Sequence, residues 1–149
     1  MAVNTLPIFP LTPYAASCSL IAASACTSRA PATLANLVLT PIFAVALTTA
    51  QTNGLRIDRI QVKAAATAIG GATTAGTVII WMSDGTTGWA IDELLVTVVT
   101  PSASVASFTT YNTYTNLVIP STHALYASGT IVGAAAANAL IVTAFGGAY

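Results

Sequence analysis

The adjacent carboxylates Asp92 and Glu93 are the first candidates for chemistry, because a facing pair of carboxylic acids is the usual apparatus for cleaving a glycosidic bond. They stand in residues 89–100 (WAIDELLVTVVT), a β-prone run. Neighbouring residues of a strand point to opposite faces, so the two side chains do not face each other. We interpret the pair as a polar strand start. The functional alternative is an ion pair with Arg56 or Arg59 of a neighbouring subunit. Such a pair would fix the register of the two subunits more than it would raise their affinity.

The other reactive side chains are too few for a catalytic or metal centre. Asp84 opens the sequence DGTTG, but an EF-hand calcium loop needs several further oxygen ligands, so we expect a hairpin turn whose Asp accepts bonds from its own backbone. His123 is the single histidine and has no acidic partner nearby in the sequence. Cys18 and Cys26 also lack neighbouring ligands and are interpreted as semi-buried thiols, with a disulfide as the second reading. We therefore expect no enzyme activity, no metal and no cofactor.

The aromatic residues allow either core packing or a sugar-binding face, since aromatic rings stack on sugars and also mark interfaces. They are Trp81, Trp89, Tyr111, Tyr114 and Tyr126. We favour core packing for Trp81. Trp89 follows a Gly-containing loop and is the better candidate for a contact residue.

The composition predicts association with other proteins. Of 149 residues, 55% are hydrophobic and 5% are charged, and the formal net charge is zero. Little self-repulsion keeps such chains apart, so we expect a homo-oligomer. Four Lys and Arg residues cannot neutralise many phosphates, which argues against binding nucleic acid or an anionic membrane.

The sequence predicts neither a membrane-spanning segment nor an export signal. We find no uninterrupted apolar run of about 18 residues that would span a membrane. No Lys or Arg precedes Arg29, so an export signal with a basic start is not expected and the chain is predicted to fold in a cytoplasm.

Short β-prone segments separated by turn signals predict one all-β domain. Residues 17–45 suggest two or three strands, and further strands are expected at 55–66, 77–83, 89–100, 108–115, 123–128 and 138–144. The apolar phase slips between Ile57 and Ile60, which predicts a β-bulge near Asp58. Asn53-Gly54 predicts a hairpin turn, and Gly146-Gly147 is interpreted as a flexible joint.

Prolines 7, 10 and 13 predict that residues 1–16 form an extended N-terminal arm, either polyproline-like or an edge strand. Residues 17–149 then make a single domain. The number and spacing of the strands indicate a jelly-roll-like antiparallel β-sandwich.

From Gly54 onward the motifs resemble those of small bacteriophage capsid decoration or cement proteins. They are NGLRIDRIQVKA, TVIIWMSDGTTGWAIDELLV, TPSAS, NLVIPSTHALYAS and ALIVTAFGGAY. The resemblance implies a jelly roll that sits on the capsid lattice, often as a trimer. The first third of the chain matches only in having a Pro-rich arm.

This resemblance implies a non-enzymatic virion protein, made in the host cytoplasm, that binds the major capsid protein from outside and stabilises the head through multivalent contacts. A carbohydrate-binding virion appendage on the same fold is the alternative. The contact candidates are Pro7, Phe9, Pro10, Arg56, Arg59, Asp92, Glu93, Trp89 and Tyr149.

Overall fold

A computed structural model describes five segments of the chain, residues 12–20, 29–43, 54–64, 73–130 and 139–148. The regular structure in these segments is β, apart from a 3₁₀ turn at Leu34–Asn36. The strands are β1 (Thr12–Leu20), β2 (Ala32–Thr33), β3 (Thr40–Phe43), β4 (Leu55–Ala64), β5 (Gly76–Ser83), β6 (Thr87–Val96), β7 (Thr109–Ile119), β8 (Ala124–Gly129) and β9 (Leu140–Ala148). The prediction of an all-β chain is confirmed.

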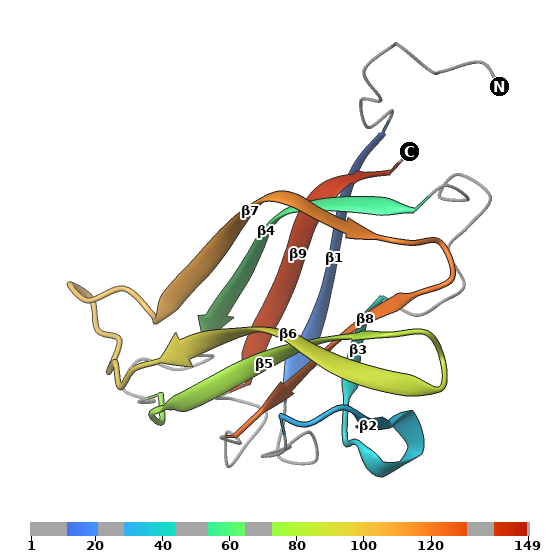
Figure 1. The fold of residues 1–149 in the computed structure, drawn as a ribbon. Coiled ribbons are helices and arrows are strands. Elements are labelled where there is room, and N and C mark those ends of the chain that lie inside the picture. Colours follow the sequence, from blue (N-terminus) through green and yellow to red (C-terminus); the bar gives the residue numbers. More distant parts are fainter. Residues whose placement is uncertain (1–11, 21–28, 44–53, 65–72, 131–138, 149) are drawn as a thin grey trace, which may run out of the picture.

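The strands form two antiparallel sheets that pack against each other as a β-sandwich (Figure 1). Sheet A has the order β1-β9-β4-β7, and sheet B has the order β2-β6-β5-β8-β3. Buried Leu, Ile and Val side chains from both sheets fill the space between them, with Ile57 and Ile60 of sheet A and Val78 and Ile80 of sheet B all fully buried. No helix among the described residues is long and apolar enough to cross a membrane.

The β-bulge predicted near Asp58 is confirmed. On β4, Ile57 pairs with Gly146 of β9 and Arg59 pairs with Phe145, so Asp58 is the extra residue between them. The same shift occurs against β7 on the other side. The bulge returns Ile60 to the face that Ile57 occupies, and both side chains enter the core.

The hairpin predicted at Asn53-Gly54 is wrong. Gly54 has a φ of +100°, which suits a tight turn, while Asn53 lies outside the described residues. However, β4 is hydrogen-bonded to β7 on one side and β9 on the other, so neither edge is left for the strand that precedes it. The preceding described strand, β3, belongs to sheet B and not to the sheet of β4.

Gly146 and Gly147 are not a flexible joint. They lie within β9, which continues to Ala148 and is paired on both sides, with β1 and with β4. Gly146 is required because a Cβ there would lie 1.8 Å from the Arg56 carbonyl oxygen. The glycine pair therefore marks a close approach of two strands beside the bulge.

Residues 12–16, expected in the arm, are the first half of β1. β1 is an edge strand of sheet A, where Pro13 fits because edge strands tolerate a missing N–H. Pro7, Phe9 and Pro10 lie outside the described residues.

Candidate interaction surfaces

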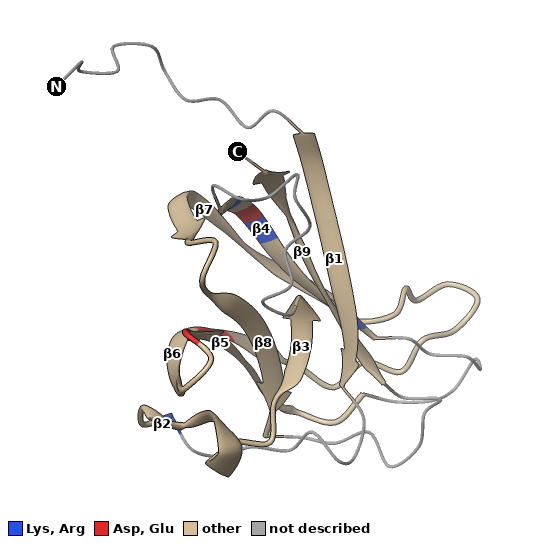
Figure 2. Ribbon diagram, turned by 90° about the vertical axis from the view of Figure 1, so that its right-hand side faces the viewer, with Lys and Arg blue, Asp and Glu red and all other residues tan. Residues whose placement is uncertain are grey.

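All eight formally charged side chains lie between Arg29 and Glu93, and every one is within the described segments. No Lys, Arg, Asp or Glu occurs in residues 94–149. Figure 2 shows charges of both signs on β4 and acidic residues on the β5–β6 side of the molecule. Most of the surface of this protein therefore carries no charge, and the few charged groups are confined to particular faces.

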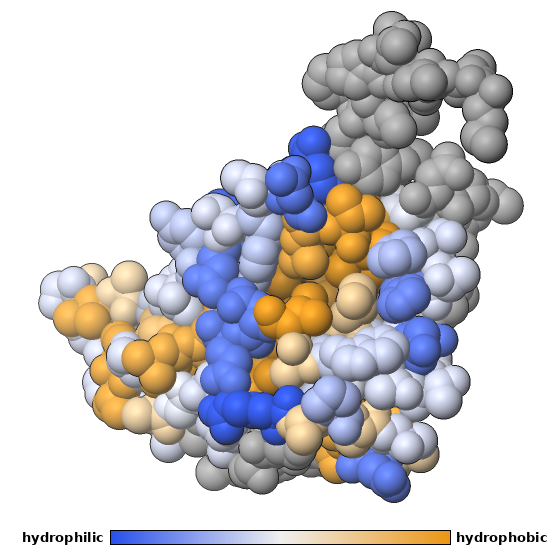
Figure 3. All heavy atoms as spheres, in the orientation of Figure 1, coloured by the Kyte–Doolittle hydropathy of each residue, from blue (hydrophilic) through white to orange (hydrophobic). Residues whose placement is uncertain are grey.

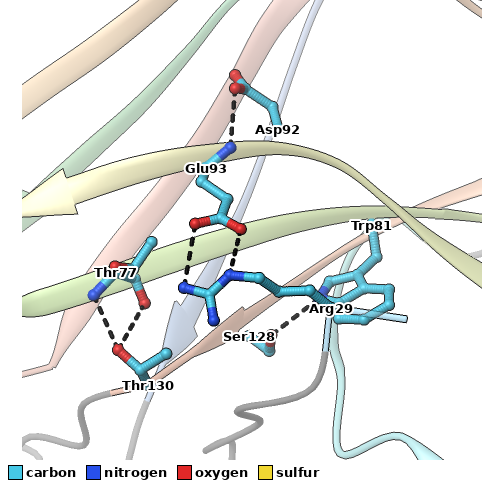
Figure 4. A network of polar contacts seen from close by, with 7 residues as sticks. All are labelled: Arg29, Thr77, Trp81, Asp92, Glu93, Ser128 and Thr130. Atoms are coloured by element: carbon cyan, nitrogen blue, oxygen red, sulfur yellow. Dashed lines mark hydrogen bonds and ion pairs between the residues drawn. The ribbon is translucent and has the colours of Figure 1, made fainter. Parts of the chain in front are cut away.

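The acidic pair points to opposite sides of β6, as predicted. Asp92 lies half-buried between the sheets and accepts hydrogen bonds from the Asn112 amide, at 2.8 Å, and from the Tyr114 hydroxyl. Burial, together with the Asp92 carboxylate, raises the pKa of Tyr114, so its hydroxyl stays protonated and donates. Glu93 faces outward and binds Arg29 through two contacts of 2.5 and 3.2 Å (Figure 4).

The arginines expected to pair with Asp92 or Glu93 have other partners within this chain. Arg56 binds Asp58, its neighbour across the bulge, at 2.8 Å. Arg59 lies over the rings of Phe145 and Tyr111, with its guanidinium carbon 4.5 and 5.9 Å from the two ring centroids. The sequence pattern gave no sign that Arg29 would be the partner of Glu93, because 64 residues separate them.

The outer face of sheet A is formed by alternate residues of its strands. Arg59 pairs across the ladder with Phe145, and Lys63 pairs with Ile141. Gln61 pairs with Tyr111, which is 58% exposed. We call the exposed side of sheet A around Arg59, Lys63, Tyr111 and Phe145 the cationic face.

Trp81 is fully buried, as the expectation of packing requires, but it does not belong to the core between the two sheets. Val78 and Ile80 on β5 point into the sandwich, so Trp81 points to the opposite, outer side of sheet B. Its indole N–H donates to the Ser128 hydroxyl at 2.9 Å (Figure 4). A Cβ on Gly88 would meet the Leu37 side chain at 2.8 Å and the Trp81 ring at 3.7 Å, which shows that the segment between β2 and β3 covers this side of the sheet.

The β5–β6 turn behaves as the sequence predicted. Asp84 Oδ1 accepts the backbone N–H groups of Thr86 and Thr87, both at 2.8 Å, and these bonds lower the pKa of its carboxyl group. Within the described segments no three His, Cys, Asp or Glu side chains come together as a metal site. Half-buried Trp89 stacks on His123 of the β7–β8 turn, with ring centroids 6.3 Å apart.

The end of β6 and the β6–β7 connection expose apolar side chains that the sequence interpretation overlooked. Leu95 is 67% exposed, Val98 63% and Val105 47%. Figure 3 shows apolar surface gathered where this connection projects from the sandwich. We call Leu95, Val98 and Val105 the apolar tip. The signal was the run of valines and leucines after Glu93 without a single charge, which had been interpreted only as strand and Ser-rich linker.

The base of the apolar tip is held in place by Thr73. Its hydroxyl donates to the Thr97 carbonyl oxygen at 2.7 Å and accepts the Val99 N–H at 2.8 Å. A further turn closes the far end, where Ser102 N–H donates to the Val105 carbonyl oxygen at 2.9 Å. The exposed valines are therefore presented on an ordered support rather than on a loop without internal bonds.

The remaining predicted residues add little to a site. Cys18 is buried in the core, and burial raises the pKa of its thiol to about 12, as an unreactive structural cysteine requires. Cys26 and the contact candidate Tyr149 lie outside the described residues. Comparisons with protein-family models, with curated proteins and with solved structures find no match to this chain.

Proposed function

We propose that the sandwich is a jelly roll. The pairing of strands supports this because it is nested: β1 pairs with β9, β3 with β8, β4 with β7 and β5 with β6. A long hairpin folded over on itself gives this order, with two sheets of four strands. The two-residue β2 adds a short edge next to β6.

We further propose that the protein is a structural virion subunit that binds the outer surface of a phage capsid, through the major capsid protein, as a decoration or cement protein. The observation that carries the proposal is the apolar tip, three exposed aliphatic side chains near the start of residues 94–149, a region that has no charge. Such surface is unfavourable in water and becomes favourable when another protein covers it.

Multivalency explains how a small contact would suffice. Three aliphatic side chains bury too little surface to hold one copy on a shell. In a trimer, binding of the first tip raises the effective concentration of the other two, so weak contacts act together. The Pro-rich segment before Thr12 is proposed to add a second contact from each copy.

A carbohydrate-binding virion appendage is the second candidate. The observation that favours it is the half-buried Trp89 stacked on His123, with the exposed carboxylate of Asp84 in the adjacent turn. A ring with one open face can stack on a sugar, and a carboxylate can accept its hydroxyl groups. A glycan array in which Trp89→Ala abolishes binding would support this reading.

The capsid proposal is tested by cosedimentation with heads assembled without this protein. We expect saturable binding by the wild type, and at least about tenfold weaker binding by Val98→Asp, because the variant places a charge in the apolar contact. Val38→Asp is the matched control, since Val38 is also 51% exposed but lies outside the tip. Binding that is absent in the wild type, or equal in both variants, would contradict the proposal.

A further inference from the structure

The charges of this chain are segregated between the two sheets. β4 in sheet A carries three cations, Arg56, Arg59 and Lys63, and one carboxylate, Asp58, which gives that sheet a formal charge of +2. The outer side of sheet B and its covering segment carries Arg29, Asp84 and Glu93, a formal charge of −1, because Asp92 points between the sheets toward Asn112 and Tyr114. A molecule of zero net charge thus has two sides of opposite charge.

The cationic face has two cations without a carboxylate partner among the described residues. Each of the four carboxylates is engaged elsewhere: Asp58 with Arg56, Glu93 with Arg29, and the other two, Asp84 and Asp92, with hydrogen-bond donors. Arg59 lies over two rings and Lys63 is exposed. Aromatic rings and Arg side chains are enriched in surfaces that pack against protein.

We propose that copies of this chain associate head to tail, with the cationic face of one copy against the sheet B side of the next. This inference deepens the proposed function, because it specifies the contact that builds the proposed trimer. On the receiving side, Asp84 is exposed and forms no ion pair within the described segments, and Glu93 is 39% exposed. Asp84 can therefore face an incoming cation directly, whereas Glu93 would share its carboxylate with Arg29.

The distribution of charge also argues against a two-fold symmetric contact between copies. A two-fold symmetric contact would place one cationic face on another, and like charges across an interface are unfavourable. A heterologous contact instead joins the cationic face, with a formal charge of +2, to the sheet B side, with a formal charge of −1, and such contacts close into a ring when the rotation between copies allows it. A ring of three is the trimer proposed above.

Sedimentation velocity of the full chain at low salt, without capsids, tests this contact. We expect a wild-type oligomer that weakens as salt is added. Lys63→Gln should weaken self-association, and Lys63→Glu should weaken it at least about tenfold, because reversal places like charges together. Ala35→Glu, on the sheet B side, changes the net charge as much as Lys63→Gln does, and it should leave association unchanged or strengthen it.

Three results would overturn the inference: a monomeric wild type, Lys63 variants that associate like the wild type, or equal weakening by Lys63→Gln and Ala35→Glu. Thermal unfolding of each variant, which should match the wild type because these positions are exposed, excludes misfolding as the cause. Binding to heads is measured separately, by cosedimentation of the wild type and of the apolar-tip variant Val98→Asp. Loss of oligomer in the Lys63 variants without any head binding by the wild type would support this contact and refute the capsid proposal.

Discussion

Replacing Gly146 by alanine tests the most constrained point of the sandwich. Gly146 lies opposite Ile57, directly beside the extra residue Asp58, and the bulge brings the backbone of β4 close to β9. An alanine Cβ would lie 1.8 Å from the Arg56 carbonyl oxygen and 3.0 Å from the Ile57 Cα. Both neighbours are backbone atoms of a strand paired on both sides, so neither can move aside as a flexible side chain would.

The expected loss of stability follows from the displacement that is needed. A Cβ rarely approaches an atom closer than 3.0 Å, so the two strands must separate by more than 1 Å at Gly146. Overpacking of this kind costs roughly 1–3 kcal/mol or more. Each ladder hydrogen bond that is broken adds about 1 kcal/mol. We expect a total of roughly 3–5 kcal/mol, a large part of the 5–15 kcal/mol that stabilises a typical domain.

Urea unfolding at fixed protein concentration, followed by tryptophan fluorescence, measures this loss. Gly85→Ala is the matched control: its φ of +93° strains an alanine, but nothing lies within 4 Å of the added Cβ. We expect Gly146→Ala to cost several times more than Gly85→Ala. If Gly146→Ala costs about the same as the control, or less, β9 does not lie against the bulge as described and the glycine pair is the flexible joint that the sequence suggested.

Two further predictions concern buried groups. Ser128→Ala leaves the indole N–H of Trp81 buried without an acceptor and should cost about 1–3 kcal/mol in urea unfolding; a cost near zero would show that water reaches the indole. Cys18 has an ordinary pKa of 9.0 when unfolded and a pKa of about 12 when folded, so its contribution to stability is complete below pH 9 and is lost as the pH rises toward 12. Unfolding measured from pH 8 to 11 should therefore show a steeper loss in the wild type than in Cys18→Ala, and parallel curves would contradict the burial of the thiol.

Local patterns along single strands could be predicted from the sequence. The apolar residues Leu55 and Ile57 and then Ile60 and Val62 are out of phase by one residue, and one bulge at Asp58 corrects this. The prediction succeeded because burial of one face of a strand depends only on alternation. The Asp84 turn was predictable for a similar reason, since an aspartate bonds to backbone groups two and three residues ahead.

Pairings between distant strands could not be predicted in the same way. Asn53-Gly54 is a strong local hairpin signal, but β4 gains more by pairing with β7 and β9, whose sequences lie far ahead. The position of Gly146 in a ladder depends on that same pairing. Trp81 is buried on the outer side of sheet B beside the segment that joins β2 to β3, and strand alternation contains no information about such a cover.

Some features of the candidate surfaces could likewise be predicted from local sequence, and others could not. Trp89 as a partly exposed aromatic, and Asp92 and Glu93 as inward and outward neighbours on one strand, follow from local sequence. The Arg29 partner of Glu93 and the exposure of the apolar tip depend on how whole strands are placed. An apolar run has the same sequence pattern whether its residues are buried in a core or exposed on the surface. The apolar tip could therefore be identified only from the structure.

Cryo-electron microscopy of heads assembled without this protein and then incubated with an excess of it tests the central proposal most directly. The account predicts added three-lobed density at symmetric positions on the outer surface, with the β6–β7 connections directed toward the shell. A reconstruction without added density at saturating protein, or with the β6–β7 connections pointing into solvent, would contradict it.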